Sequence, residues 1–321
     1  MRCNTSNITH NTLLNEHRIV RLRKEIERML HMIRDVYYWP TDRHRVIRLD
    51  HMLINAVAEL AGKMRGKYLQ EPDYTAAIVT EFVPMAQHRH VFGSAKVGGA
   101  FILQRPKVTF NINGHPKTCE LGDLLVLCRR MVDGEERYNA ALMQLKMAHS
   151  NNNLAISSSG ELVQLYLYTK WPVFRCANGV NYDIQPKMVT LGAQYMFVNE
   201  DDNPLFTHHI PQERMLNRDY YSFGRFLSDF VDWQNGRPIL DAANKDADEW
   251  SKLIWDVIEH NANAYFRRRN VGIEHGSRNV LSFLSAISND RTDNPIVRLE
   301  VNGEEGIGCS MLFIDYAEKQ E

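Results

Sequence analysis

Apolar residues in the first quarter of the chain recur at the spacing of amphipathic helices. Over residues 13–38 they return every three or four positions, which predicts a long helix that ends before Pro40. Its apolar stripe packs against the same chain or forms a dimer seam between two copies. The same periodicity predicts a helix over 48–68 and a shorter one over 74–82, ended by Pro84.

The middle of the chain changes to short apolar runs that alternate or stand between turn residues, as strands do. An Asn-Gly pair at 113–114 and an Asp-Gly pair at 133–134 predict two hairpins. A polar stretch then leads into a helical pattern over 160–170, stopped by Trp171-Pro172. The predicted strands cover residues 100–104, 107–112, 124–128, 140–147, 173–177 and 188–198.

The last third is again helical, with one strand-rich segment at its end. Residues 199–220 are predicted to be loops, and helices are predicted near 221–234, 246–268 and 277–288. Residues 295–317 read as a terminal hairpin. This order predicts an α/β fold with a mixed sheet flanked by helices. The expected parts are a helical region at 1–72, an α/β core at 73–198 and a helical C-terminal region at 199–321.

Composition limits the class of protein. The chain has 321 residues, 44% of them hydrophobic and 24% charged, with a net charge of −1, so it reads as a soluble globular protein and not a polycation. Residues 1–70 nevertheless hold 13 Lys+Arg against 7 Asp+Glu. That excess faces an anionic partner or belongs to a solvated helix surface.

Cysteine use and hydropathy bear on compartment. The five cysteines form no CxxC pair, which argues against a zinc ribbon or a thioredoxin-like site. With a polar N-terminal segment, this favours a reducing cytoplasm. No apolar run reaches the ~18 residues that a membrane span requires, so no membrane contact is expected.

Three polar side chains interrupt the apolar hairpin of residues 120–150. Gln144 and Lys146 are two apart on one strand and therefore share a face, while Leu145 points to the other. The hairpin brings Asp123 toward them. An acid and an amide oxygen, or the Leu145 carbonyl, suit Mg²⁺ (or Mn²⁺), and a lysine beside them suits phosphodiester hydrolysis. Alternatively, Gln144 and Lys146 lie on a solvent-facing strand and Asp123 is a turn residue.

Asp123, twenty intervening residues and the run Gln144-Leu145-Lys146 resemble the PD-(D/E)xK nuclease superfamily. The resemblance is closer to its QxK branch, found in Mrr-like restriction endonucleases, and covers residues 73–180. It implies a restriction-endonuclease-like sheet in which the helix at 160–170 and the strand at 173–177 continue the core. It also implies a glutamate on a helix before the sheet, for which Glu81 is the candidate and Glu59 the rival.

The chain departs from that family's pattern at two positions. Gly122 stands where the family has proline, and glutamine replaces the commoner acid, which leaves open whether one or two metal ions bind. Glu120 is close in sequence to Asp123 and is placed on the approach to the strand.

The functions that follow fall into three classes. The resemblance implies a Mg²⁺-dependent endonuclease acting on DNA, and by family analogy an antiviral defence effector. The second class is a non-catalytic DNA-binding or assembly protein on the same fold. The third is a helical interaction protein that works through residues 13–38 and 246–268.

Overall fold

The chain divides into two compact units, residues 1–41 and residues 42–321. Every residue described below belongs to the second unit, and the helix expected over 13–38, with the basic residues it carries, lies outside the described residues. The boundaries expected at residues 72 and 198 separate no units within 42–321. The computed structural model describes residues 43–67, 69–88, 95–102, 106–132, 134–148, 154–156, 158–199, 205–211, 214–215, 222–269, 277–289, 296–299 and 308–317.

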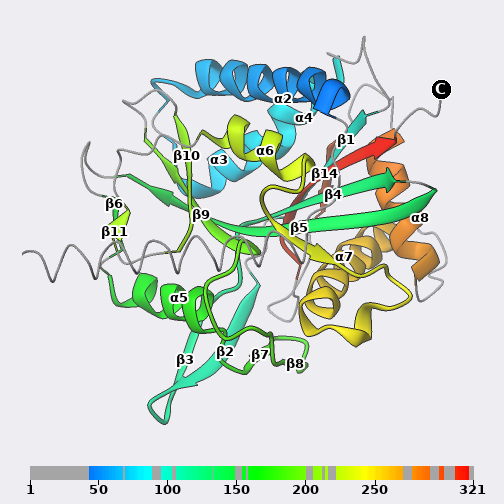
Figure 1. The fold of residues 1–321 in the computed structure, drawn as a ribbon. Helices are drawn as coiled ribbons and strands as arrows, with labels where there is room; N and C mark the ends of the chain where they lie inside the picture. The colour runs from blue at the N-terminus through cyan, green and yellow to red at the C-terminus, as the bar shows by residue number, and fades with distance from the viewer. Residues whose placement is uncertain are drawn as a thin grey trace, which may run out of the picture. The chain divides into compact units, whose positions relative to one another are not determined.

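A mixed sheet of eight strands forms the centre of the unit (Figure 1). Strands β4 (Leu124–Val132) and β5 (Glu135–Met147) form the hairpin expected from the sequence, and Gly134 in its turn has the positive φ of 82° that favours glycine. β5 pairs in parallel with β9 (Ala193–Val198), and β4 pairs in parallel with β14 (Ser310–Ala317). Across the sheet the order is β10 (Phe206–His209), β9 (Ala193–Val198), β5 (Glu135–Met147), β4 (Leu124–Val132), β14 (Ser310–Ala317), β1 (Ala95–Ile102) and β13 (Ile296–Leu299), with β12 (Arg237–Ile239) also on β5.

The prediction of a terminal hairpin over 295–317 is wrong. β13 and β14 lie on opposite sides of β1, parallel and antiparallel to it, and do not pair with each other. The apolar run Met311–Ile314 of β14 is fully buried, because a strand in the middle of a sheet has helices on both faces. The C-terminal segment therefore completes the core, which is why no boundary falls at residue 198.

Helices cover both faces of the sheet and enclose two apolar clusters (Figure 1). One face packs on α2 (Arg43–Met64), α3 (Glu71–Ala77), η1 (Ile78–Phe82), α4 (Val83–His88) and α6 (Phe223–Val231). The other packs on α5 (Ser159–Lys170), α7 (Glu249–Arg268) and α8 (Ser277–Asn289), with a short turn, η3 (Lys245–Ala247), before α7. The predicted α/β class with a mixed sheet between helices is confirmed. Among the described helices, none has the length and apolar content to cross a membrane.

The expected helices are present, with one local difference. In α2, Leu53, Leu60 and Met64 are buried along one face, as the periodicity predicts. Pro84 does not end the third helix, because the chain passes through the π-helical turn η1 and begins α4 one residue before the proline. A proline is tolerated there because the first turn of a helix needs no N–H donor from that position.

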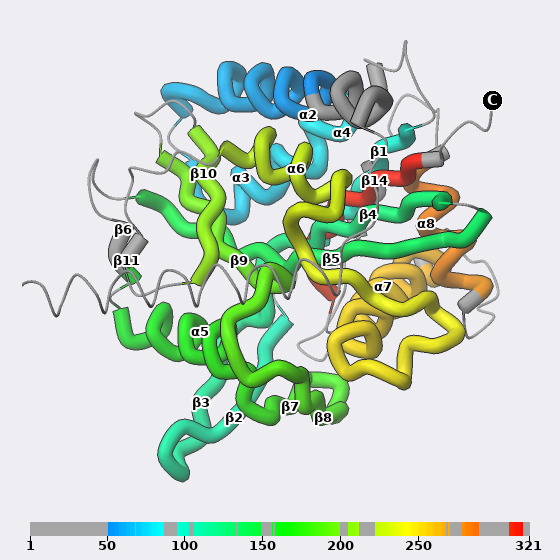
Figure 2. The backbone as a smooth tube through the Cα atoms, viewed as in Figure 1, coloured from blue at the N-terminus to red at the C-terminus, as the bar shows by residue number. Residues whose placement is uncertain are grey.

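A second, four-stranded sheet lies beside α5. Its order is β3 (His115–Glu120), β2 (Lys107–Ile112), β7 (Phe174–Cys176) and β8 (Asn181–Tyr182). The strand expected at 173–177 therefore joins β2 and not the main sheet, and the strand that follows α5 in parallel beside β5 is β9. A two-stranded pair, β6 (Leu154–Ala155) with β11 (Arg214–Met215), completes the described strands. Figure 2 traces the chain from the β2–β3 hairpin directly into β4 and β5.

Candidate functional site

Asp123 lies immediately before β4, where that strand meets the end of β5. Its N–H donates to the carbonyl of Met143 at 2.9 Å, and its Oδ2 accepts from the N–H of Leu145 at 2.8 Å. Continuing the β4–β5 register by one residue places Asp123 opposite Gln144. The structure thus brings together Asp123, Gln144 and Leu145, as the hairpin predicted.

Gln144 is buried, with 1% of its surface exposed. Its Oε1 accepts a hydrogen bond from Nε2 of Gln164 on α5, and its own Nε2 lies 3.5 Å from Oε2 of Glu120. A buried amide must find such partners, because an unsatisfied one costs about 1–3 kcal/mol. The solvent-facing alternative for Gln144 is therefore wrong.

Lys146 is partly buried near the end of β5. Its Nζ lies 3.7 Å from Oε2 of Glu71, the first residue of α3, and only 15% of the lysine side chain is exposed. Oε1 of Glu71 accepts from the N–H of Met147 at 3.2 Å. Glu71 therefore fixes the end of the strand and holds a negative charge beside the lysine.

The glutamate chosen from the sequence needs correction. Glu81 lies on η1, half exposed, and its carboxylate is 3.9 Å from Lys63. Ten residues separate it from Glu71, which is roughly 15 Å along a helix, so it cannot reach the strand end that Glu71 contacts. Glu59, the rival, is exposed on α2. The helix acid that reaches the predicted motif is Glu71.

Two residues of α5 join the site without having been predicted. Gln164 also donates to the carbonyl of Glu120 at 3.2 Å, and the hydroxyl of Tyr168 donates to the carbonyl of Leu121 at 2.6 Å. They are four residues apart and so share one face of the helix. In the sequence, the signal for these residues is a glutamine among the apolar positions on the buried side of the helix, four residues before a tyrosine.

Local interactions fix where α5 begins and ends. Ser158 and Glu161 form a capping box, in which each side chain accepts from the other's N–H, at 3.3 and 2.9 Å. Trp171 ends the helix in the left-handed region, with φ 43°. These two ends place Gln164 and Tyr168 over the strand ends.

Gly122 occupies the position at which the resembled family has proline. A Cβ there would lie 3.2 Å from Oη of Tyr168 and 3.4 Å from the carbonyl oxygen of Met143. A side chain would therefore press on the hydroxyl that holds Leu121. The close approach of α5 explains a glycine at this position.

The pKa of Asp123 is raised to about 7. Burial is the largest cause, and the nearby charges of Glu120 and Glu71 raise the pKa further. The Leu145 N–H and the charge of Lys146 act in the opposite direction. Three carboxylates and one lysine thus interact at this end of the sheet. Because the acids outnumber the lysine, a bound cation would stabilise this arrangement.

The donor chemistry of the cluster suits a hard cation, although its geometry is incomplete. Carboxylate and amide oxygens from Asp123, Glu120 and Gln144 are the ligand types that Mg²⁺ prefers. In the part of the chain that the structure describes, however, no three His, Cys, Asp or Glu side chains are grouped with the spacing of a metal site. One oxygen of Asp123 is held by Leu145 N–H, so a bound cation would rely on its other oxygen, on Glu120 and on the Leu145 carbonyl named from the sequence.

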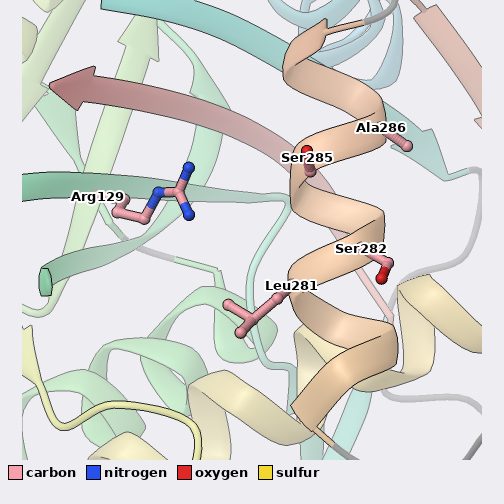
Figure 3. A pocket seen from close by; sticks show the side chains of 5 residues that line it. All are labelled: Arg129, Leu281, Ser282, Ser285 and Ala286. Carbon is pink, nitrogen blue, oxygen red and sulfur yellow. The ribbon is translucent and has the colours of Figure 1, made fainter.

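A second polar feature lies at the other end of β4. A hollow of about 580 Å³ is lined by Arg129 and four residues of α8 (Figure 3), namely Leu281, Ser282, Ser285 and Ala286. The guanidinium of Arg129 donates to both carboxylate oxygens of Asp315, at 3.0 and 2.7 Å, and to Glu136 at 3.4 Å. Its donors face carboxylates of the same chain, so the hollow is poorly suited to phosphate.

Comparisons with protein-family models, curated proteins and solved structures found no match to this chain.

Proposed function

We propose that this protein is a metal-dependent phosphodiester hydrolase that cleaves DNA at the cluster of Asp123, Gln144 and Lys146, on a restriction-endonuclease-like sheet. The observation that carries the proposal is the bond from Leu145 N–H to Asp123, which holds an acid against a Gln-x-Lys strand. The electrostatic coupling of Asp123 to Glu120, Glu71 and Lys146 supports it. The defence role and the cytoplasmic location belong to this proposal as family analogies.

Each residue has a role that follows from its contacts. Asp123 and Glu120 would hold Mg²⁺ (or Mn²⁺), which when bound supplies positive charge to the phosphate and activates water. Lys146, held in place by Glu71, stabilises the extra negative charge on the phosphoryl oxygens as water attacks. The water oxygen forms the new P–O bond and releases a proton to solvent, the bond to the leaving oxygen breaks, and that oxygen takes a proton from solvent.

The supporting residues set the geometry. Gln164 fixes the amide of Gln144, and Tyr168 fixes the chain at Leu121 two residues before Asp123. Because both come from one face of α5, a displacement of that helix would move the acid and the amide together. They are positioning residues and do not contact the reacting atoms.

Plasmid nicking and linearisation with Mg²⁺ or Mn²⁺ test the proposal, with single-stranded DNA and RNA as further substrates. Asp123→Asn should abolish cleavage and Lys146→Met should slow it by roughly 100-fold, the loss typical of a preorganised charge. Asp246→Asn, an exposed acid on η3, is the matched control and should cleave like the wild type. Equal cleavage by the wild type and Asp123→Asn would show that the site is wrong.

One observation favours a second candidate, a non-catalytic DNA-binding protein on the same fold. Oxygens of Asp123 and Glu71 accept backbone N–H groups, and no metal-spaced group of three such side chains occurs in the described residues. In that case the two acids accept hydrogen bonds from the N–H groups at the end of β5 and bind no metal. Mg²⁺ would then leave the melting temperature unchanged at pH 8, whereas a hydrolase site would be stabilised by it.

A further inference from the structure

The small sheet β3-β2-β7-β8 carries an excess of positive charge on its surface. Lys107, Lys117 and Arg175 are exposed, and none of them has an ion pair within the described part of the chain. The only acid on these four strands is Glu120. The sheet therefore carries a net charge of +2, from three cations and one acid, in a chain whose net charge is −1.

The two faces of this sheet differ. Val108 and Phe110 point inward, and Phe110 stacks on Tyr166 of α5 with ring centroids 6.2 Å apart. The opposite face is polar apart from Pro116, which pairs in register with Asn111, and it is exposed except at Glu120, which is half-buried. Its residues, given by strand register, are Lys107, Thr109 and Asn111 on β2, Thr118 and Glu120 on β3, Arg175 on β7 and Asn181 on β8.

This outer face leads into the candidate site. Glu120 pairs in register with Lys107, and its carboxylate is the one that lies 3.5 Å from Nε2 of Gln144. Three residues further along the chain stands Asp123. A ligand lying across β7 and β2 and continuing onto β3 would therefore meet Glu120 at the end of β3, with Asp123 three residues beyond it.

We propose that the outer face of this sheet holds the phosphate backbone of the nucleic acid that the site cleaves. The inference rests on the proposed function and names the surface that binds its substrate. Lys107 and Arg175 supply charge on this face, whereas Lys117, opposite Phe110 in register, points to the other. Thr109, Asn111 and Asn181 supply neutral donors of the kind that contact phosphate oxygens.

A peptide strand is a poorer occupant of this sheet. Its longer edge strand, β3, carries Pro116 and Lys117, and both residues oppose the addition of another strand; the other edge strand, β8, is only two residues long. Beside this face the one exposed large apolar side chain of the described residues is Val173, which precedes β7 and is a small anchor for a protein partner. Charge complementarity therefore selects a polyanion.

The test measures binding of labelled duplex DNA in EDTA over a range of salt concentrations, with single-stranded DNA and duplex RNA as parallel arms. The double variant Lys107→Gln, Arg175→Gln should flatten the slope of log K against log salt by about one unit per contact, so by about two. A control double variant with the same charge change, Lys63→Gln, Arg278→Gln, should keep the wild-type slope. Both double variants should keep the wild-type melting temperature.

The outcomes separate this inference from the proposed function. A reduced slope in the Lys107→Gln, Arg175→Gln variant and not in the control supports the inference, whether or not any variant cuts, and the arm that shows it identifies the polymer. A wild-type slope in the Lys107→Gln, Arg175→Gln variant overturns it, as does a wild type that binds none of the three polymers at low salt. Binding of poly-glutamate that depends on Lys107 and Arg175, without nucleic-acid binding, would overturn it in favour of an acidic protein.

Discussion

Nε2 of Gln164 on α5 donates a hydrogen bond to Oε1 of Gln144 on β5, and both amides are buried. The same nitrogen reaches the carbonyl of Glu120 at 3.2 Å. One side chain thus joins α5, β5 and the end of β3. This contact holds Gln144 and the chain at Glu120, two of the residues near Asp123.

Gln164→Leu should destabilise the protein by about 1–3 kcal/mol, because Oε1 of Gln144 would stay buried without a donor. The double variant Gln144→Leu, Gln164→Leu removes both polar groups and should cost less than the sum of the single changes. Urea denaturation of the four proteins measures the coupling. Strictly additive costs would show that the two amides do not depend on each other.

Asp123→Asn should remove a pH dependence of stability. The pKa of Asp123 is raised from 3.8 to about 7, so the folded protein binds an extra proton between those values. Its contribution to stability is therefore full below about pH 4 and is lost as the pH rises toward 7. At pH 8 the variant should be more stable than the wild type, and at pH 4 the difference should shrink. A difference that does not change between pH 4 and pH 8 would contradict the raised pKa.

Mg²⁺ should stabilise the wild type more at pH 8 than at pH 6. The pKa of Asp123 is about 7, so at lower pH the cation must displace a proton from this carboxyl group. The apparent affinity for Mg²⁺ therefore decreases as the pH is lowered. Thermal denaturation with 10-fold steps of Mg²⁺ measures the shift, and Asp123→Asn serves as the comparison. The expected result is a concentration-dependent rise in melting temperature that the variant lacks. An equal rise in both proteins would place the cation elsewhere.

Gly122→Ala should cost about 1–3 kcal/mol through overpacking, because the new Cβ would lie 3.2 Å from Oη of Tyr168. Tyr168→Phe removes that oxygen, so in the Tyr168→Phe background the alanine should cost less. Denaturation of the single and double variants gives the coupling. If the alanine costs the same in both backgrounds, Tyr168 is not what restricts this position.

Glu71→Gln should lower cleavage roughly 10-fold, because Lys146 loses the charge that holds it, whereas Glu81→Gln should have no effect. The glutamine keeps an oxygen for the Met147 N–H, which limits the change to charge. Single-turnover cleavage rates, with melting temperatures as a check on folding, compare the two variants. A loss of cleavage in Glu81→Gln and not in Glu71→Gln would instead support Glu81, the glutamate predicted from the sequence.

Much of the secondary structure was determined by local sequence. The periodicity of Leu53, Leu60 and Met64 predicts α2, and the Asp-Gly pair at 133–134 predicts the β4–β5 hairpin, because both signals act between residues close in the chain. The hairpin also fixes the approach of Asp123 to Gln144, since its register follows from the turn and the buried pattern. The core of the candidate site could therefore be predicted.

The tertiary structure alone decided which distant elements complete that core. A buried apolar run such as Met311–Ile314 shows that a strand is internal but not which strands lie beside it. The position of β14 between β4 and β1, the choice of Glu71 over Glu81, and the bond from Gln164 to Gln144 all depend on packing between segments far apart in the chain. Sequence periodicity reports which face of an element is buried, whereas the partner on that face is set by how the whole chain fills its interior.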